Sequence, residues 1–217
     1  MVRFRARFAG GLRLLWLVII PAAAGYVVLA RPIVGALLER GALTTDAADQ
    51  TARVLVAFAV GLPGFSRYLY ALRGFYALGD VRTPFALAAV ENLLNIVFAL
   101  LLEPSGGVVG LALASSMAYA SAALVAVATL ERRIGRFVDR RTAGALVRVA
   151  GASAVMAVAV TAVGHVVRHS PQVIQMASGV TAGIAVFGVA TSLLKVPELK
   201  DLRRAATVPF KRRAASP

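Results

Sequence analysis

Polar side chains inside a long apolar stretch give the first pointer to chemistry in this sequence. Glu91 and Asn95 are four residues apart, so they share one helix face, with Asn92 beside them. Arg67 lies at a similar depth in the preceding apolar stretch, and we expect it to form an ion pair with Glu91. The four residues either line a hydrated cavity for a polar head group or tie neighbouring helices together. Both interpretations are open at this point.

The sequence has few residues that could act in catalysis or bind a metal ion. The chain of 217 residues has no cysteine and two histidines, His165 and His169, which leaves no thiol chemistry and little scope for a transition-metal site. No acidic residue is placed to orient either histidine as the base for a nucleophile such as Ser115 or Ser116. We therefore expect no catalytic residue, no metal site and no cofactor.

The apolar stretches predict an integral membrane protein. Hydrophobic residues make up 59% of the chain and the mean hydropathy is +0.77, and about 20 mostly apolar residues are enough to cross the hydrocarbon core. The expected fold is an all-α, polytopic helical bundle with six transmembrane helices. The six spans run near residues 12–30, 54–72, 84–102, 108–130, 143–167 and 173–194.

The basic residues predict how the bundle is oriented. The net charge is +14, but the basic residues lie between apolar spans, so nucleic acid is not an expected partner. The positive-inside rule places both termini in the cytoplasm. The chain then divides into four spans over 1–130, a basic cytoplasmic loop over 131–142, a final pair of spans over 143–194 and a basic cytoplasmic tail over 195–217. Within the tail, residues 197–204 read either as an amphipathic helix bound to membrane lipids or as a plain stop-transfer sequence.

A short helix in the outer membrane interface is expected between the first two spans. Residues 31–41 hold Pro32, which suits a helix start, and Gly41, which suits a helix end. Thr44 or Thr45 should then cap the second span. The apolar face of the short helix would comprise Ile33, Val34, Leu37 and Leu38.

Pro63 and Gly64 interrupt the second span and predict a kink near its middle. Such a kink either acts as a pivot beside a transport cavity or only improves packing. Elsewhere, small residues at helical spacing favour close packing inside the bundle over a dedicated dimer face. These small residues are Gly110, Ala114, Ala118 and Ala122 in the fourth span, and Gly179 and Gly183 in the sixth.

The connection between the second and third spans has a clear turn signature. Gly79 and Asp80 are expected to make the turn, and Arg82 adds inner charge. Thr83 followed by Pro84 combines a helix N-cap with a proline at the first helical position. These residues predict a tight cytoplasmic hairpin.

The same connection carries the most specific pattern in the chain. Phe75-Tyr76, followed a few residues later by Thr83-Pro84, resembles the F-Y-A to T-P segment of the MurJ (MviN) family of lipid II flippases. Residues 31–43 are similar to another stretch of the family, although leucine occupies the last position, where an aromatic residue is usual. Residues 110–116 are similar to the family's Gly-Leu-Ala-Leu run.

The resemblance implies the last six of fourteen transmembrane helices in a carrier, not in an enzyme. The implied substrate is the lipid-linked peptidoglycan precursor, moved across the bacterial cytoplasmic membrane by alternating access, with a groove beside the last two helices for its polyprenyl tail. The arginines with which the family grips the pyrophosphate correspond to no position here, so a separate N-terminal half is a further candidate partner. Half of a polysaccharide-lipid or multidrug exporter, or a non-transporting membrane scaffold, remain as alternatives.

Overall fold

The computed structural model is all-helical and describes residues 2–38 and 44–194. The tail helix considered for residues 197–204 lies outside these ranges. Within the described residues there are five helices, each long and apolar enough to cross a membrane. They are α1 (Val2–Leu38), α2 (Thr45–Ala77), α3 (Arg82–Ile134), α4 (Arg140–Val166) and α5 (Gln172–Leu193).

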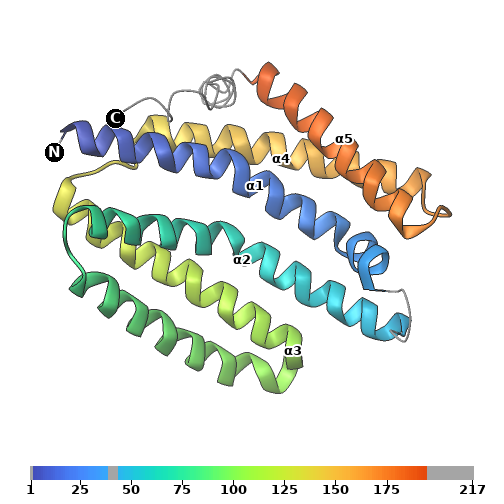
Figure 1. The fold of residues 1–217 in the computed structure, drawn as a ribbon, viewed down its shortest axis with the longest axis horizontal. Helices are drawn as coiled ribbons and strands as arrows, with labels where there is room; N and C mark the ends of the chain where they lie inside the picture. Colours follow the sequence, from blue (N-terminus) through green and yellow to red (C-terminus); the bar gives the residue numbers. More distant parts are fainter. Residues whose placement is uncertain (1, 39–43, 195–217) are drawn as a thin grey trace, which may run out of the picture.

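Helix α3 combines two of the predicted spans, because it folds back on itself at Gly107. The backbone at Gly107 has φ 53° and ψ −134°, a conformation that only glycine adopts readily. Figure 1 shows the two arms of α3 running side by side in opposite directions. The Asn95 side chain on the first arm donates a hydrogen bond to the Ser115 hydroxyl on the second, at 3.3 Å. The predicted spans near 84–102 and 108–130 therefore correspond to the two helical arms of α3, which meet at the non-helical kink of Gly107.

The helix ends segregate by charge. Figure 1 shows the start of α1, the α2–α3 connection and the α3–α4 connection together at one end of the bundle. The Gly107 bend and the α4–α5 connection lie at the other end. We call the first of these the basic end, because the two connections and the adjoining helix termini carry Arg3, Arg5, Arg7, Arg73, Arg82, Arg132, Arg133, Arg136 and Arg140.

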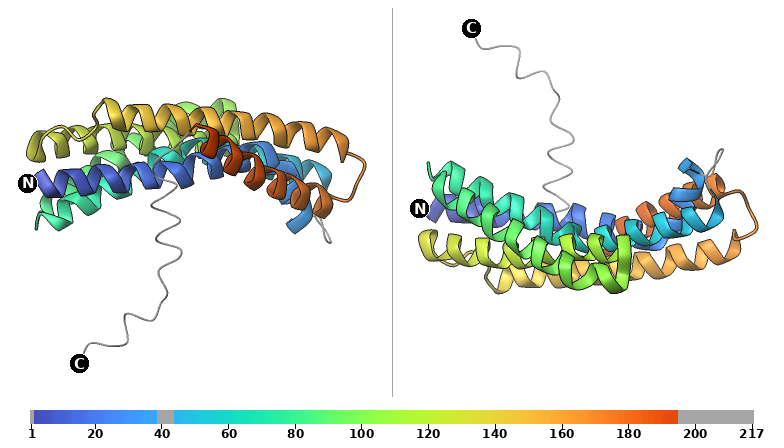
Figure 2. Two further views of the ribbon diagram at one scale, coloured as in Figure 1. Left: turned by 90° about the horizontal axis from the view of Figure 1, so that it is seen from above. Right: turned by 90° about the horizontal axis from the view of Figure 1, so that it is seen from below.

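Helix α1 holds the two sides of the bundle together. It packs against α2 on one side and against α4 and α5 on the other, while α2 also packs against α3. Figure 2 shows that the long helices are nearly parallel and that the bundle is gently curved. The largest core cluster lies toward the basic end, where the Phe8 ring meets Tyr70 and, edge-on, Phe137. The Tyr70 hydroxyl also donates a hydrogen bond to the Phe8 carbonyl at 3.0 Å.

The expected separate helix over 31–41 is wrong as far as the described residues reach. Helix α1 continues through Pro32 to Leu38, because a proline in a long helix can bend the axis without ending the helix. Only part of the expected apolar face is buried: Val34 packs against Ala48 and Ala52 of α2, whereas Leu37 is exposed. The remainder of that segment, residues 39–41, lies outside the described ranges.

Helix α2 begins at the cap that the sequence predicts. Thr44 caps the helix, and its hydroxyl accepts a hydrogen bond from the Ala47 backbone N–H at 3.3 Å. Asp46 lies in the first turn, where the negative charge of a carboxylate interacts favourably with the positive end of the helix dipole. Asp49, one turn further on, forms an ion pair with Arg31 of α1. This pair ties α1 to α2 at the end of the bundle opposite the basic end.

The segment of α2 around Pro63 and Gly64, where the sequence predicts a kink, packs closely against α3. The helix runs without a break through Pro63, although Figure 1 shows its direction changing along its length. A Cβ atom on Gly61 would lie 2.7 Å from the Ser116 Cα, and one on Gly64 would lie 2.9 Å from the Ala120 Cα. The Ser116 hydroxyl also donates a 2.7 Å hydrogen bond to the Ala57 carbonyl. The glycines therefore let α2 and the second arm of α3 approach backbone to backbone.

The predicted ridges of small residues pack within the chain. Gly110 is buried against the Leu102 backbone at the return of α3, and the three alanines that follow it at four-residue steps are also buried. Gly179 of α5 faces the Leu29 side chain of α1, and Gly183 faces Val160 of α4. The preference for internal packing over a dimer face is confirmed for these positions.

Substituting Gly61 tests this packing. We expect Gly61→Leu to lower the unfolding temperature of the detergent-solubilised protein, because overpacking a close contact costs about 1–3 kcal/mol. Gly151→Leu is the matched control, since Gly151 is exposed and has nothing within 4 Å of a Cβ atom. Both changes gain the same helix propensity. Equal unfolding temperatures for the two variants would contradict the contact.

Candidate functional site

An apolar groove lies between α1, α4 and α5. Its volume is about 490 Å³, and it runs along the outer surface of these helices. Gly25 leaves open space on the α1 side of the groove. The residues that line it are Leu17, Val18, Pro21, Ala22, Gly25, Tyr26, Leu29, Ile33, Met156, Val160, Gly179, Val180, Gly183, Ile184 and Phe187.

The chemistry of this groove suits a hydrocarbon chain. Its lining has no charged side chain, and its only strongly polar side-chain atom is the phenol oxygen of Tyr26, whose side chain is exposed. A Cβ atom on Gly25 would have nothing within 4 Å, so the space above that residue is empty. Along most of its length the groove offers a ligand only van der Waals contacts with its apolar walls, which are weak singly and add up over a long chain. The expectation of a groove beside the last two helices agrees with this geometry.

The predicted polar cluster only partly comes together. Glu91 is 5% exposed and lies near the phenol groups of Tyr68 and Tyr119. The expected ion pair with Arg67 is wrong: within the described residues, the structure forms none between these two side chains. Successive residues of a helix point about 100° apart, and it is Tyr68, not its neighbour Arg67, that lies near Glu91.

Asn92 and Asn95 differ in their surroundings. Asn95 bonds to Ser115 across the two arms of α3, which supports a structural role for that residue. Asn92 is exposed, and its Nδ2 donates a 2.8 Å hydrogen bond to the carbonyl of Ala88 in its own helix. The two interpretations of the cluster therefore apply to different members: Asn95 ties helix arms together, whereas Asn92 faces outward.

The hairpin at the basic end is capped by Asp80 instead of Thr83. Helix α3 begins at Arg82. The Asp80 carboxylate accepts hydrogen bonds from the backbone N–H groups of Arg82 and Thr83, both at 3.0 Å, and from the Thr83 hydroxyl at 2.6 Å. A carboxylate is the stronger acceptor, so the Thr83 hydroxyl acts as a donor. Pro84 is buried in the first turn, where its missing N–H costs nothing.

Arg133, at the far end of α3, completes this cluster. Its guanidinium forms an ion pair with Asp80 and donates a 3.1 Å hydrogen bond to the Thr83 hydroxyl. The same guanidinium lies 5.8 Å from the centre of the Phe75 ring, which is fully buried. Tyr76, the second aromatic residue of the loop pattern, is 54% exposed. The buried ring and the ion pair thus fix both ends of α3 to the loop.

Sequence reasoning missed Arg133 and the capping role of Asp80. The sequence shows their opposite charges, and the predicted topology places both residues on the cytoplasmic side of the membrane. Pairing them required the register between the two arms of α3, which the Gly107 bend sets. Hydrogen bonds from the Thr83 hydroxyl and backbone, together with the charge of Arg133, hold the pKa of the Asp80 carboxyl below its ordinary value.

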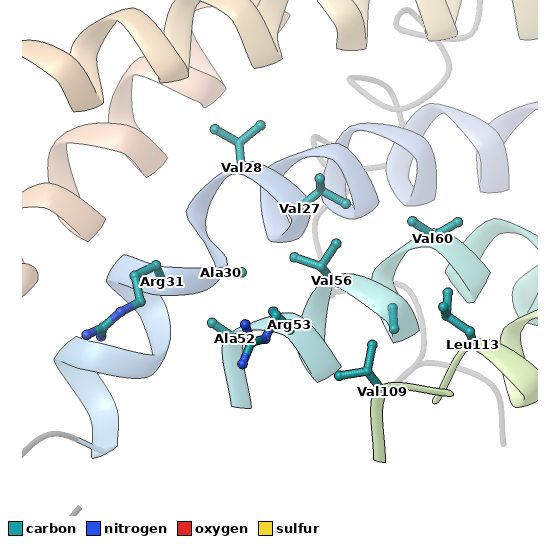
Figure 3. A pocket seen from close by; sticks show the side chains of 11 residues that line it. Val27, Val28, Ala30, Arg31, Ala52, Arg53, Val56, Val60, Val109 and Leu113 are labelled. Atoms are coloured by element: carbon teal, nitrogen blue, oxygen red, sulfur yellow. The ribbon is translucent and has the colours of Figure 1, made fainter. Parts of the chain in front are cut away.

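A smaller recess lies at the opposite end of the bundle. Figure 3 shows Arg31 and Arg53 beside it, among valine side chains of α1, α2 and the second arm of α3. Its volume is about 420 Å³. Arg31 already forms an ion pair with Asp49. Within residues 2–38 and 44–194, no three His, Asp or Glu side chains come together in a way that could hold a metal ion.

Comparison with known proteins adds family information. Residues 2–182 match the family described as "Lipid II flippase MurJ". The chain is 30% identical over 218 residues to a probable lipid II flippase MurJ of Synechocystis sp., which covers 96% of this chain and 40% of the relative. It is 36% identical over 111 residues to a probable lipid II flippase MurJ of Rhizobium meliloti, covering 51% of this chain and 21% of the relative.

The fold is also similar to a solved structure. A lipid II flippase MurJ in an inward closed conformation superposes with a TM-score of 0.76 at 22% identity, covering 88% of this chain and 39% of the other. At this identity the likeness concerns the fold. The chain spans less than half the length of each of these relatives.

We expect the Asp80 cluster to make a pH-dependent contribution to stability. Since the folded pKa of Asp80 is lowered, its interactions stabilise the native state above the ordinary carboxyl pKa of about 4 and are lost as the pH falls through the lowered value. Asp80→Asn should therefore reduce the unfolding temperature at neutral pH, and the difference from wild type should shrink in acid. Glu103→Gln, at an exposed carboxylate near the Gly107 bend, is the control. A difference that is independent of pH would contradict the assignment.

Proposed function

The chain belongs to the MurJ family of lipid II flippases, and on that premise we propose that it is the C-terminal portion of a flippase for a lipid-linked peptidoglycan precursor. The family match over residues 2–182 carries this proposal. The chain is a multi-pass protein of the bacterial inner membrane, and its substrate would cross that membrane by alternating access of the assembled transporter.

In this proposal each arm of α3 crosses the membrane, which gives six spans with both termini in the cytoplasm. Each arm has at least the roughly 20 residues that a span requires. The common position of the arginines at the basic end supports a cytoplasmic location for that end, including the loop within residues 131–142.

The apolar groove would hold the polyprenyl tail of the substrate. Its lining is apolar, and it lies beside α4 and α5. A long isoprenoid chain can lie along such a groove while its pyrophosphate and sugars occupy the polar path between the two halves of the transporter. The polar path would be completed by a separate N-terminal half, with Arg67, Glu91, Asn92 and Asn95 as candidates for contacts on this side, and with Pro63 and Gly64 as a pivot.

Two other functions are less well supported. Half of a polysaccharide-lipid or multidrug exporter would belong to another family of the exporter superfamily that also includes the lipid II flippases, whereas the family match is to lipid II flippases. A non-transporting scaffold needs no groove lined by glycine and proline. The discriminating observation is whether the chain supports flipping when the missing part of the fold is supplied.

Complementation tests the function. In cells depleted of their flippase, this chain alone should fail to restore growth, whereas co-expression with a matching N-terminal half should restore it. Failure of the pair, with both polypeptides present in the membrane, would count against transport. Restoration by the chain alone would contradict the need for a second half.

The groove is tested in the same assay. Gly25→Trp should fill the groove and abolish growth restoration by the pair while leaving the unfolding temperature unchanged, because there is open space above Gly25. Gly151→Trp, at an exposed glycine outside the groove, should restore growth as wild type does. Growth restoration by the Gly25→Trp pair would contradict the placement of the polyprenyl tail in this groove.

A further inference from the structure

The apolar groove between α1, α4 and α5 has a definite length. Its α1 lining runs from Leu17 to Ile33 in two adjacent rows, and the residues of each row recur at steps of four, so they share one face of the helix. Leu17 and Ile33 are sixteen residues apart in the continuous helix α1, which at 1.5 Å per residue is about 24 Å. This face of α1 sets how much of a ligand the groove can hold.

The groove is closed at the end nearer the basic end. Leu17 is 2% exposed and packs against Val149 of α4, and Phe187 of α5 packs against this pair. Leu17 and Phe187 also line the groove. A hydrocarbon chain lying in the groove therefore meets packed side chains from all three helices at this end.

The other end of the groove is polar. A recess of about 240 Å³ adjoins the groove there, since both are lined by Leu29 and Val160. The same recess is also lined by Thr161, His165 and Gln175. The Gln175 side chain donates a 2.8 Å hydrogen bond to the Ser170 carbonyl in the α4–α5 connection. Polar groups give hydrocarbon no favourable partner, so the apolar part of the track ends where these side chains begin.

The middle of the groove is open. Gly25 lies eight residues from Leu17 and eight residues from Ile33. A Cβ atom on Gly25 would have nothing within 4 Å. One ligand chain can therefore run past this point from the closed end to the polar end, whereas a large side chain at position 25 would divide the groove in two.

The length of the groove discriminates between the hydrocarbon chains of a membrane. Each isoprene unit adds four carbon–carbon bonds of about 1.5 Å to a prenyl chain, or roughly 5 Å of extended length. A groove of about 24 Å thus holds about five units. One acyl chain of a phospholipid reaches across half of the hydrocarbon core, or about 15 Å. It would leave part of the groove empty.

We propose that the groove sets a minimum length for the tail of the substrate, because it is filled only by a prenyl chain of about five isoprene units or more. The inference rests on the proposed function and names the feature of the tail that the groove selects. Units beyond this length lie outside the groove and add no contacts with it. A phospholipid fills the groove incompletely and is bound less tightly.

The test measures how binding depends on tail length. Prenyl phosphates with two, three, four, five and seven isoprene units share one head group, and native mass spectrometry of the purified chain in detergent gives the affinity of each. The affinity should rise roughly threefold with each added unit, the order expected from a handful of new carbon contacts. It should level off at about five units. An affinity that ignores tail length, or that rises without a break to seven units, overturns the proposal.

Two variants move the point at which binding levels off. Gly25→Trp fills the middle of the groove, so the gain should end at about two units. Val18→Trp, at a half-exposed lining residue near the closed end, should end it at an intermediate length. Gly151→Trp, outside the groove, should follow wild type and corrects for partition of the lipids into detergent. Identical profiles for all three variants would overturn the proposal.

Competition tests the selection against phospholipid. Phosphatidylglycerol should displace the five-unit prenyl phosphate less effectively than a second prenyl phosphate of that length does, and equal displacement overturns the proposal. Growth restoration by the pair of halves reports on the proposed function separately. Growth without a length-dependent affinity sinks only the length requirement, whereas a length-dependent affinity without growth sinks only the flippase activity.

Discussion

The hydrocarbon core of the membrane is the constraint on which the rest of this structure depends. Inside it every backbone group must be paired, so the described chain is built from long helices. Apolar side chains gain little by leaving lipid for another helix, so specificity comes from close approach of small residues and from a few hydrogen bonds. The contacts of Gly61 and Gly64 with the second arm of α3 show the first means, and the hydrogen bond from Asn95 to Ser115 shows the second.

The polar constraints are concentrated at the basic end. There the Asp80 carboxylate caps α3 and pairs with Arg133, which also lies over the Phe75 ring. One ion pair therefore fixes the loop, the start of α3 and the end of α3 relative to one another. The groove at α1, α4 and α5 has the opposite character, because its lining is apolar apart from the Tyr26 phenol and there is open space above Gly25. Polar contacts therefore hold the basic end together, whereas apolar side chains line the groove.

The sequence predicts the helices much better than their contacts. Hydropathy located every helix in the described part of the chain, since the bilayer demands long apolar runs, and the Thr44 cap follows from local chemistry. The continuation of α1 through Pro32 could not be predicted, because a proline bends one long helix and ends another depending on what packs beside it. The predicted ion pair between Arg67 and Glu91 was wrong, because the depth of a residue along a helix does not tell in which direction around the helix axis its side chain points. Only the packed bundle supplies that rotation.

The central claim, that the basic end faces the cytoplasm in a six-span arrangement, is tested most directly by thiol labelling. The chain has no cysteine, so Arg136→Cys and Ser105→Cys each provide one thiol at opposite ends of the bundle. In intact spheroplasts, a membrane-impermeant maleimide should label position 105, and it should label position 136 only after the membrane is permeabilised. Labelling of position 136 before permeabilisation would contradict the orientation and the flippase topology built on it.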